Sequence, residues 1–149
     1  MAVLRNDPYS GQNFLIDLGD GQSDGPHGGF QEISGLETML DIADYRTGND
    51  RDVSPSKSAG LARVAHVTLR RGIIGSLDLY YWFDTARQGG KDALRTVRIT
   101  LLNEVREPVL VWKLLRARPV KLGYDGLNAL GRNVAMEELV LAYERLEME

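Results

Sequence analysis

The chain has 149 residues, a formal net charge of −3, 43% hydrophobic residues and 26% charged residues. These values are typical of a globular protein, and the length suits one domain with its own core, so we predict a single domain over residues 1–149. The mild negative charge does not favour nucleic acid as the natural partner, and a chain without cysteine has neither disulfides nor thiolate chemistry.

The first part of the chain alternates short apolar segments with polar loops. Residues 13–18 predict a strand, and residues 30–34 begin the next one. Between them, residues 19–29 form a loop rich in glycine and aspartate. Gly35 offers a bend, and residues 48–60 predict a second long polar loop. Two such loops in a small domain are more often functional than mere connections.

The segment from Leu36 to Arg46 has two interpretations. As a strand, its even positions are apolar at first and charged at the end, whereas its odd positions become more apolar. Such a strand begins on its own core and ends against something else, for which a neighbouring subunit is a candidate. As a helix, Leu36, Met39, Leu40 and Ala43 follow the i, i+3, i+4, i+7 pattern. Periodicity alone leaves both interpretations open.

The middle of the chain predicts a strand followed by a helix. Residues 61–71 alternate, with Ala65, Val67 and Leu69 on one face, which indicates a strand. Ser76 is a suitable N-cap residue, and residues 77–88 carry an apolar stripe at helical spacing before a Gly-Gly pair. We therefore predict a helix over about 76–88.

Three more strands are predicted in the last third of the chain, over residues 94–102, 109–115 and 133–146. A turn at 103–108 makes the first two a hairpin, and Pro119 marks a strand end or a sheet edge. About seven strands and one helix are best satisfied by a small β-barrel or two packed antiparallel sheets. We therefore predict a mainly β fold with one flanking α-helix.

Side chains suited to catalysis or cofactor binding are few. His66 has no second histidine at ligand spacing, and His27 lies in the glycine-rich loop. That loop lacks a Gly-Lys-Ser/Thr motif, and its aspartates lack the alternate spacing of an EF-hand. Glu137 and Glu138 would point to opposite faces of one strand, so they could not act as an acid–base pair. We predict no catalytic residue, no metal site, no cofactor and no enzymatic activity.

Two further groups of side chains have simple structural interpretations. The aromatic run over residues 80–83 lies at helical spacing, which predicts core packing rather than ligand stacking. Arginines scattered over several predicted strands indicate solvated strand faces. These arginines are Arg70, Arg71, Arg95, Arg98, Arg106, Arg116 and Arg118.

Several short segments, in order along the chain, resemble tail tube proteins of contractile phages and of phage-tail-like injection systems. The opening and middle segments are residues 13–17, 29–37, 44–49, 67–72 and 79–82. The closing segments are residues 111–112, 117–119, 127–129 and 133–139. No single motif is decisive, and the resemblance depends on their order over most of the chain.

The resemblance implies a small β-barrel or sandwich whose subunits join into six-membered rings that stack into a tube inside a contractile sheath. It favours the strand interpretation of residues 36–46 and implies a hairpin over about 36–61 that reaches the adjacent ring. The residues expected at this interface are Leu36, Met39, Leu40, Ile42, Ala43 and Tyr45. The loop at 19–29 is longer than expected for a main tube subunit, which leaves a ring at the baseplate end as an alternative.

The resemblance also implies function and partners. The tube would be driven through a target envelope on sheath contraction, and its partners would be copies of itself, the sheath, and hub or spike proteins of the baseplate. Cargo could occupy the channel, and nucleic acid only if a phage genome passes through it. Without a signal sequence or an apolar span, we expect synthesis in the cytoplasm, no membrane anchor, and assembly into a phage tail or injection particle.

Two other functions remain open at this point. A baseplate protein of the same fold would form one ring without polymerising. A monomeric ligand-binding β-barrel of lipocalin-like size would instead place Trp82 or Trp112 in an internal cavity.

Overall fold

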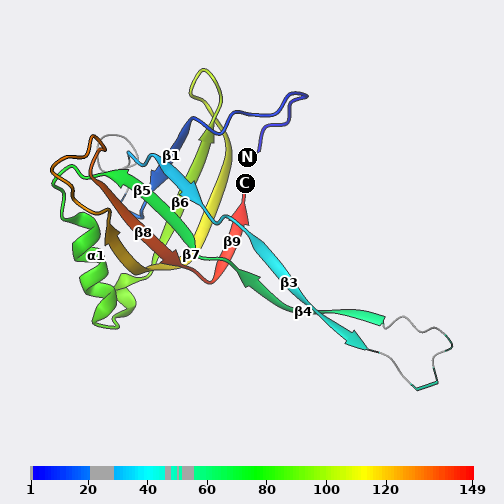
Figure 1. The fold of residues 1–149 in the computed structure, drawn as a ribbon. Helices are drawn as coiled ribbons and strands as arrows, with labels where there is room; N and C mark the ends of the chain where they lie inside the picture. Colours follow the sequence, from blue (N-terminus) through cyan, green and yellow to red (C-terminus); the bar gives the residue numbers. More distant parts are fainter. Residues whose placement is uncertain (1, 21–28, 46–47, 50, 52–55) are drawn as a thin grey trace.

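The computed structural model describes residues 2–20, 29–45, 48–49, 51 and 56–149, with backbone alone for Tyr45 and residues 56–59. Figure 1 shows a β-rich body, a helix on one side of it, and a long hairpin that extends away from it. The strands are β1 Phe14–Asp17, β2 Glu32–Ser34, β3 Thr38–Tyr45, β4 Ser56–Val64, β5 Val67–Gly72, β6 Arg95–Leu102, β7 Pro108–Tyr124, β8 Met136–Ala142 and β9 Arg145–Met148. The helices are α1 Asp78–Arg87 and the short 3₁₀ turn η2 Lys91–Ala93.

Strand β7 organises the body, because its two halves belong to two sheets. Its first half pairs with β6 on one side and with β9 on the other. Its second half pairs with β8, which continues through β5 to β2. Arg116 has a left-handed φ of 54° between the halves, where the chain changes partners. All of these pairings are antiparallel, and they confirm the predicted mainly β fold with two packed sheets.

The core lies between these sheets and α1. Alternate residues of β5, β6 and β8 point inwards, as period-two strands require. Trp82 closes the core from the helix, and its indole N–H donates a hydrogen bond to the Ala93 carbonyl at 2.7 Å. The main buried side chains are Ile16, Val67, Leu69, Leu79, Trp82, Val97, Ile99, Leu114, Leu139 and Leu141.

The predicted helix is present, with two corrections. Leu77, not Ser76, occupies the N-cap position, although the Ser76 hydroxyl still accepts a hydrogen bond from the Asp78 N–H at 3.3 Å. Gly89 follows the helix with a left-handed φ of 76°, as a C-terminal glycine should. In the aromatic run, Trp82 is buried but Tyr80 and Tyr81 are exposed, so the expected core packing holds for only part of it.

Two predicted boundaries around the hairpin are wrong. Residues 61–71 are not one strand, because β4 ends at Val64 and β5 begins at Val67. The chain turns here from the hairpin into the body, where Gly35 lies so close to the backbone that an added Cβ would be 2.2 Å from the His66 carbonyl oxygen. Residues 56–60, predicted as loop, extend β4, because β3 supplies their hydrogen-bonding partner.

Two boundaries near the C-terminus also differ from the prediction. Strand β7 continues past the expected end, and Pro119 lies buried inside it. The proline is tolerated because the pairing with β8 shifts between Pro119 and Lys121. Residues 133–146 divide into β8 and β9, which pair with opposite halves of β7 and therefore cannot be one straight strand.

Candidate assembly surface

The β3–β4 hairpin forms its own two-stranded sheet and pairs with none of the other strands. Its pairing runs from Thr38 opposite Val64 to Tyr45 opposite Ser56, with an irregularity between Leu40 and Ile42. At this irregularity the backbones of β3 and β4 approach each other closely, and a Cβ added to Gly60 would lie 2.5 Å from the Asp41 carbonyl oxygen. Among the described residues, the ladder that contains β3 and β4 has only these two strands, and the edges of a two-stranded ribbon readily accept another chain.

The base of the hairpin is fastened to the body. Leu36 and Val64 are partly buried and pack against the core. The Ala65 N–H donates a hydrogen bond to the Glu37 carbonyl at 3.3 Å, which continues the pairing towards the base. Gly35, with a φ of 90°, makes the bend in a region that favours glycine. The direction of the hairpin is therefore set by packed residues.

Beyond the base, apolar side chains lie in solvent. Met39 is 48% exposed, Leu40 60% and Ile42 51%, and Leu61 on the opposite strand is 74% exposed. Neighbouring positions 39 and 40 point to opposite faces of the ribbon, so both faces carry apolar groups. An ion pair of 2.7 Å between Arg63 and Asp41 crosses the two strands.

The predicted interface residues thus fall into three groups. Leu36 belongs to the fastened base, whereas Met39, Leu40, Ile42 and Ala43 lie on the exposed part of one strand. Tyr45 lies at the far end of β3, and its side chain falls outside the described residues. Residues 21–28, which include His27 and most of the glycine-rich loop, also lie outside them. The change from a buried to an unburied setting along this strand matches the pattern in the sequence.

A buried ionic cluster holds α1 against the sheet. Arg71 is 1% exposed and Glu137 5%, and the two residues lie opposite each other on β5 and β8 with their side chains ion-paired. The Arg71 guanidinium also contacts Asp78 at 2.6 Å, in the first turn of the helix. Burial acts to raise the pKa of Asp78, but hydrogen bonds from Arg71 and Ser76 outweigh it and hold that pKa below its ordinary value.

The arginines of the predicted strands were expected to lie on solvated faces, and this prediction was wrong for Arg71. The alternation of residues along the sequence already pointed to an inward position for it. Arg71 continues the alternation of Val67 and Leu69, and Glu137 continues that of Leu139 and Leu141. Two opposite charges at inward positions of two strands predict a buried pair once the strands are known to be neighbours. That neighbour relation was the missing information.

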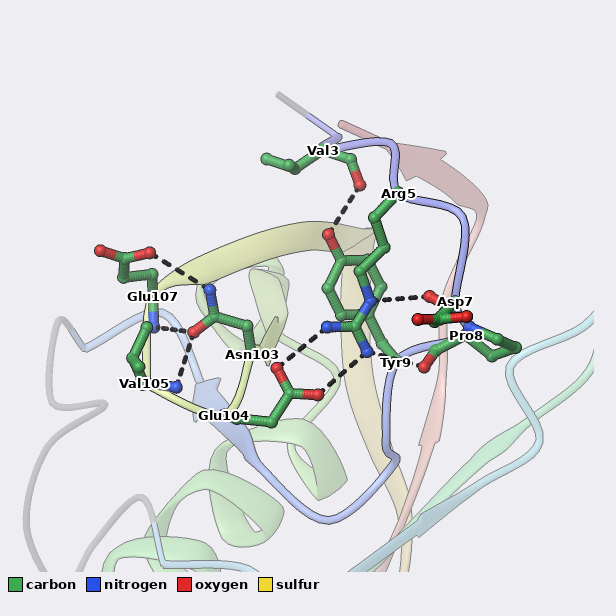
Figure 2. A network of polar contacts seen from close by, with 9 residues as sticks. All are labelled: Val3, Arg5, Asp7, Pro8, Tyr9, Asn103, Glu104, Val105 and Glu107. Carbon is green, nitrogen blue, oxygen red and sulfur yellow. Dashed lines mark hydrogen bonds and ion pairs between the residues drawn. The ribbon is translucent and has the colours of Figure 1, made fainter.

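The N-terminal arm is held by a second polar network (Figure 2). Arg5 donates to both carboxylate oxygens of Glu104 at 2.9 and 3.0 Å and to the Asp7 and Pro8 carbonyls at 2.7 Å each. Its guanidinium carbon lies 3.9 Å from the centre of the Tyr9 ring. The hydrogen bond from Arg5 lowers the pKa of Glu104 below its ordinary value. The arm is therefore fastened to the turn between β6 and β7.

Among the residues that the structure describes, no group of three or more His, Cys, Asp or Glu side chains is placed to hold a metal ion. Within the same residues, no helix is both long enough and apolar enough to cross a membrane. The described geometry is a two-sheet body that carries a hairpin with exposed apolar side chains, an arrangement typical of proteins that assemble.

Comparison with known proteins identifies the kind of assembly. The family model described as "T4-like virus tail tube protein gp19" matches residues 11–147. The chain therefore belongs to this tail tube family. No curated protein matches the chain in sequence.

Solved structures agree with the family assignment. One similar chain belongs to the PVC extracellular contractile injection system, in its extended sheath–tube complex, with 26% identity, a TM-score of 0.81, and coverage of 95% of this chain and 91% of that one. Another comes from the baseplate of the anti-feeding prophage, with 28% identity, a TM-score of 0.80 and 97% coverage of both chains. Hcp1 from Flavobacterium johnsoniae, at 14% identity and a TM-score of 0.54, shares the fold over 91% of this chain and 93% of that one.

The family assignment decides between the functions considered from the sequence. The chain is a structural tail tube protein and not an enzyme. The family assignment therefore rules out the hypothesis of a monomeric, lipocalin-like ligand carrier. The resemblance drawn from short ordered segments is confirmed, and so is the general function derived from it.

Proposed function

We propose that this chain forms the main tube of a contractile injection particle, as rings that stack through the β3–β4 hairpin. The single observation that supports this proposal most is the hairpin itself, whose Met39, Leu40 and Ile42 are about half exposed on a ribbon that leaves the body. Apolar side chains arranged contiguously on a protruding element indicate a protein–protein contact. If the hairpin of one subunit contacts a different surface of the next, the contact is heterologous and can repeat without limit along a tube.

The ring is proposed to have six members, since the related anti-feeding prophage baseplate was solved with 6-fold symmetry. Sheath contact is proposed from the similar chain in a sheath–tube complex, and hub or spike contact from the baseplate relative. On contraction the sheath would drive the tube through a target envelope, with any cargo inside its channel. We further propose cytoplasmic synthesis before assembly into the particle.

Residues 1–149 are proposed to act as one unit in this assembly. The buried Arg71–Glu137 pair and the Arg5–Glu104 pair join segments far apart in the sequence, which supports a single folding unit. A ring at the baseplate end is the second candidate, because the baseplate relative is as similar in structure as the sheath–tube relative.

The proposal is tested by substituting Asp at Met39 and Tyr45 together and viewing the purified chain by negative-stain electron microscopy. We expect the wild type to form tubes and the variant to stop at rings or smaller species, because charge replaces apolar groups at the proposed contact. Tyr81→Asp on the exposed face of α1 serves as the control. Unchanged tubes in the double variant would contradict the proposed role of the hairpin.

The baseplate alternative gives a different result in the same experiment. A wild-type chain that forms rings but never elongates, even at high concentration, would favour a single-ring protein. Sedimentation velocity separates this outcome from a monomer near 16.6 kDa, which would contradict both candidates.

A further inference from the structure

A heterologous contact needs two different surfaces on each subunit, and the hairpin supplies one of them. The body carries a second apolar surface on segment 124–135, which connects β7 to β8. Tyr124 is 57% exposed, Leu127 83%, Leu130 93% and Val134 73%. Leu127 and Val134 also line a hollow of about 610 Å³ within this segment, and Leu130 lies outside its lining, so part of the apolar surface is concave.

Backbone hydrogen bonds fix both ends of the segment and form a turn within it. Its Asp125 N–H donates to the Met136 carbonyl at 3.0 Å, and the Ile73 N–H donates to the Ala135 carbonyl at 2.9 Å, so both ends are anchored. Between them, Asn128 accepts hydrogen bonds from the N–H groups of Leu130 and Gly131, each at 3.0 Å. The apolar side chains are therefore presented outwards by a pre-formed turn, which reduces the entropy lost on binding.

Charges at the base of the segment are paired within the body. Arg70 contacts Asp125 at 2.8 Å and Glu138 at 3.1 Å. On the hairpin, Asp41 is paired in the same way with Arg63 at 2.7 Å. Asp41 and Asp125 can keep these partners when the apolar groups of the two surfaces meet, so neither carboxylate is left unpaired by the contact.

The two surfaces lie at opposite ends of the body. The hairpin leaves the body at Val67, which pairs with Leu141, whereas segment 124–135 lies beside the other end of β5, where Gly72 pairs with Met136. Figure 1 shows the same arrangement, with the orange β7–β8 connection on the side of the body away from the hairpin. Because the two surfaces lie at opposite ends, the hairpin cannot contact segment 124–135 of its own subunit. It can contact that segment in a second copy placed head to tail.

We infer that segment 124–135 is the receiving surface for the β3–β4 hairpin of a second copy of this chain in the next ring. This inference rests on the proposed stacking function and adds the surface that receives the hairpin. Leu127, Leu130 and Val134 form the acceptor, and Met39, Leu40 and Ile42 the inserted group. The contact repeats along the tube because every subunit carries both halves.

Complementation of two defective chains tests the inference. The donor-defective chain carries Met39→Asp and Ile42→Asp, and the acceptor-defective chain carries Leu127→Asp and Leu130→Asp. We expect each chain alone to form single rings. Mixed after ring formation, they should form pairs of rings and no tubes, because only one intact donor–acceptor interface is available per pair. Negative-stain microscopy counts the rings in each stack.

The absence of cysteine from the chain allows a second, independent measurement. Ile42→Cys with Leu130→Cys in one chain should give a disulfide-linked ladder on non-reducing gels after mild oxidation, and Ile42→Cys with Tyr81→Cys should not. This test requires only that the variants fold, and all three positions are exposed.

The outcomes separate this inference from the function on which it rests. If the acceptor-defective chain forms tubes like the wild type while the donor-defective chain does not, the inference is overturned and the proposed role of the hairpin stands. If the acceptor-defective chain folds but forms no rings, the inference is also overturned, because the segment then joins subunits within a ring. If the donor-defective chain itself forms normal tubes, the proposed stacking function fails first.

Discussion

The body and the β3–β4 hairpin of this protein treat the same apolar residue types in opposite ways. In the body, Leu69 and Leu139 face each other across β5 and β8 with no exposure. In the hairpin, Leu40 is 60% exposed and Leu61 is 74% exposed. Since fully burying one such side chain stabilises a protein by about 1.5–3 kcal/mol, the proposed stacking contact would gain stabilisation that the separate chain lacks.

The comparison shows how the proposed stacking could follow from a chain that has its own core but leaves apolar side chains exposed on one hairpin. An isolated two-stranded ribbon is marginally stable in water, so this one depends on its fastened base at Leu36 and Val64. The body sets the direction of the hairpin, and in the proposed stacking contact the hairpin determines which surface the body can join. Changes in the two regions should therefore have separable effects on folding and on assembly.

The two regions should differ most in how much the free energy of unfolding falls when one large apolar side chain is removed from each. Trp82→Ala is expected to lower the free energy of unfolding by about 3–5 kcal/mol, because it leaves a cavity in the core and orphans the Ala93 carbonyl. Met39→Ala on the hairpin should change it by no more than about 0.5 kcal/mol. Urea unfolding of the dilute monomer measures both, and equal losses would contradict the division into two regions.

A smaller effect within the body should come from its buried ion pair. Glu137→Ala is expected to lower the free energy of unfolding by about 3 kcal/mol, because Arg71 remains buried with one partner fewer. Replacing both residues, with Arg71→Met and Glu137→Leu, should recover much of that loss.

The matched control for this pair is Glu138→Ala. Glu138 lies on the opposite face of β8 and pairs with Arg70 nearer to solvent, so its loss should cost no more than about 1 kcal/mol. Equal costs at positions 137 and 138 would show that burial of the Arg71 cluster does not matter for stability.

The smallest expected effect is on the stability of the folded protein at acidic pH. The pKa of Asp78 in the folded protein lies below the ordinary value of 3.8, so its contribution to stability is present above that value and is lost as the pH falls through the lowered pKa. Asp78→Asn should therefore cost about 1 kcal/mol near neutral pH and flatten the fall of stability in acid. Unfolding measured from about pH 7 to about pH 3 checks this, and an unchanged acid slope would contradict the assignment.

Much of this architecture could be read from alternation and turn residues. The alternating apolar residues of β5, β6 and β8 predicted their inward faces, and Gly89 marked the end of α1. The proposed interface positions were found from the changing faces of residues 36–46, although periodicity did not separate strand from helix there. That choice depended on resemblance, and the structure confirms the strand.

The misses share one physical cause. Pro119 was expected to mark a strand end or a sheet edge. Strand β7 does not end there, because β8 pairs past the proline through a local shift, but among the described residues 118–124 pair with β8 alone, so the edge alternative holds. Arg71 was expected in solvent, but Glu137 and Asp78 neutralise it from β8 and α1. No interface role was predicted for segment 124–135, because its place at the end of the body opposite the hairpin depends on the tertiary structure.

By itself, the sequence determined the local conformations, since side-chain alternation and glycine placement act over a few neighbouring residues. For residues 36–46 it left two conformations open, a strand whose apolar face changes and a helix with one apolar face. Only the tertiary structure decided which strands are neighbours, which charges meet in the core, and which way the hairpin points. Those properties depend on contacts between residues far apart in the chain, which no local pattern encodes.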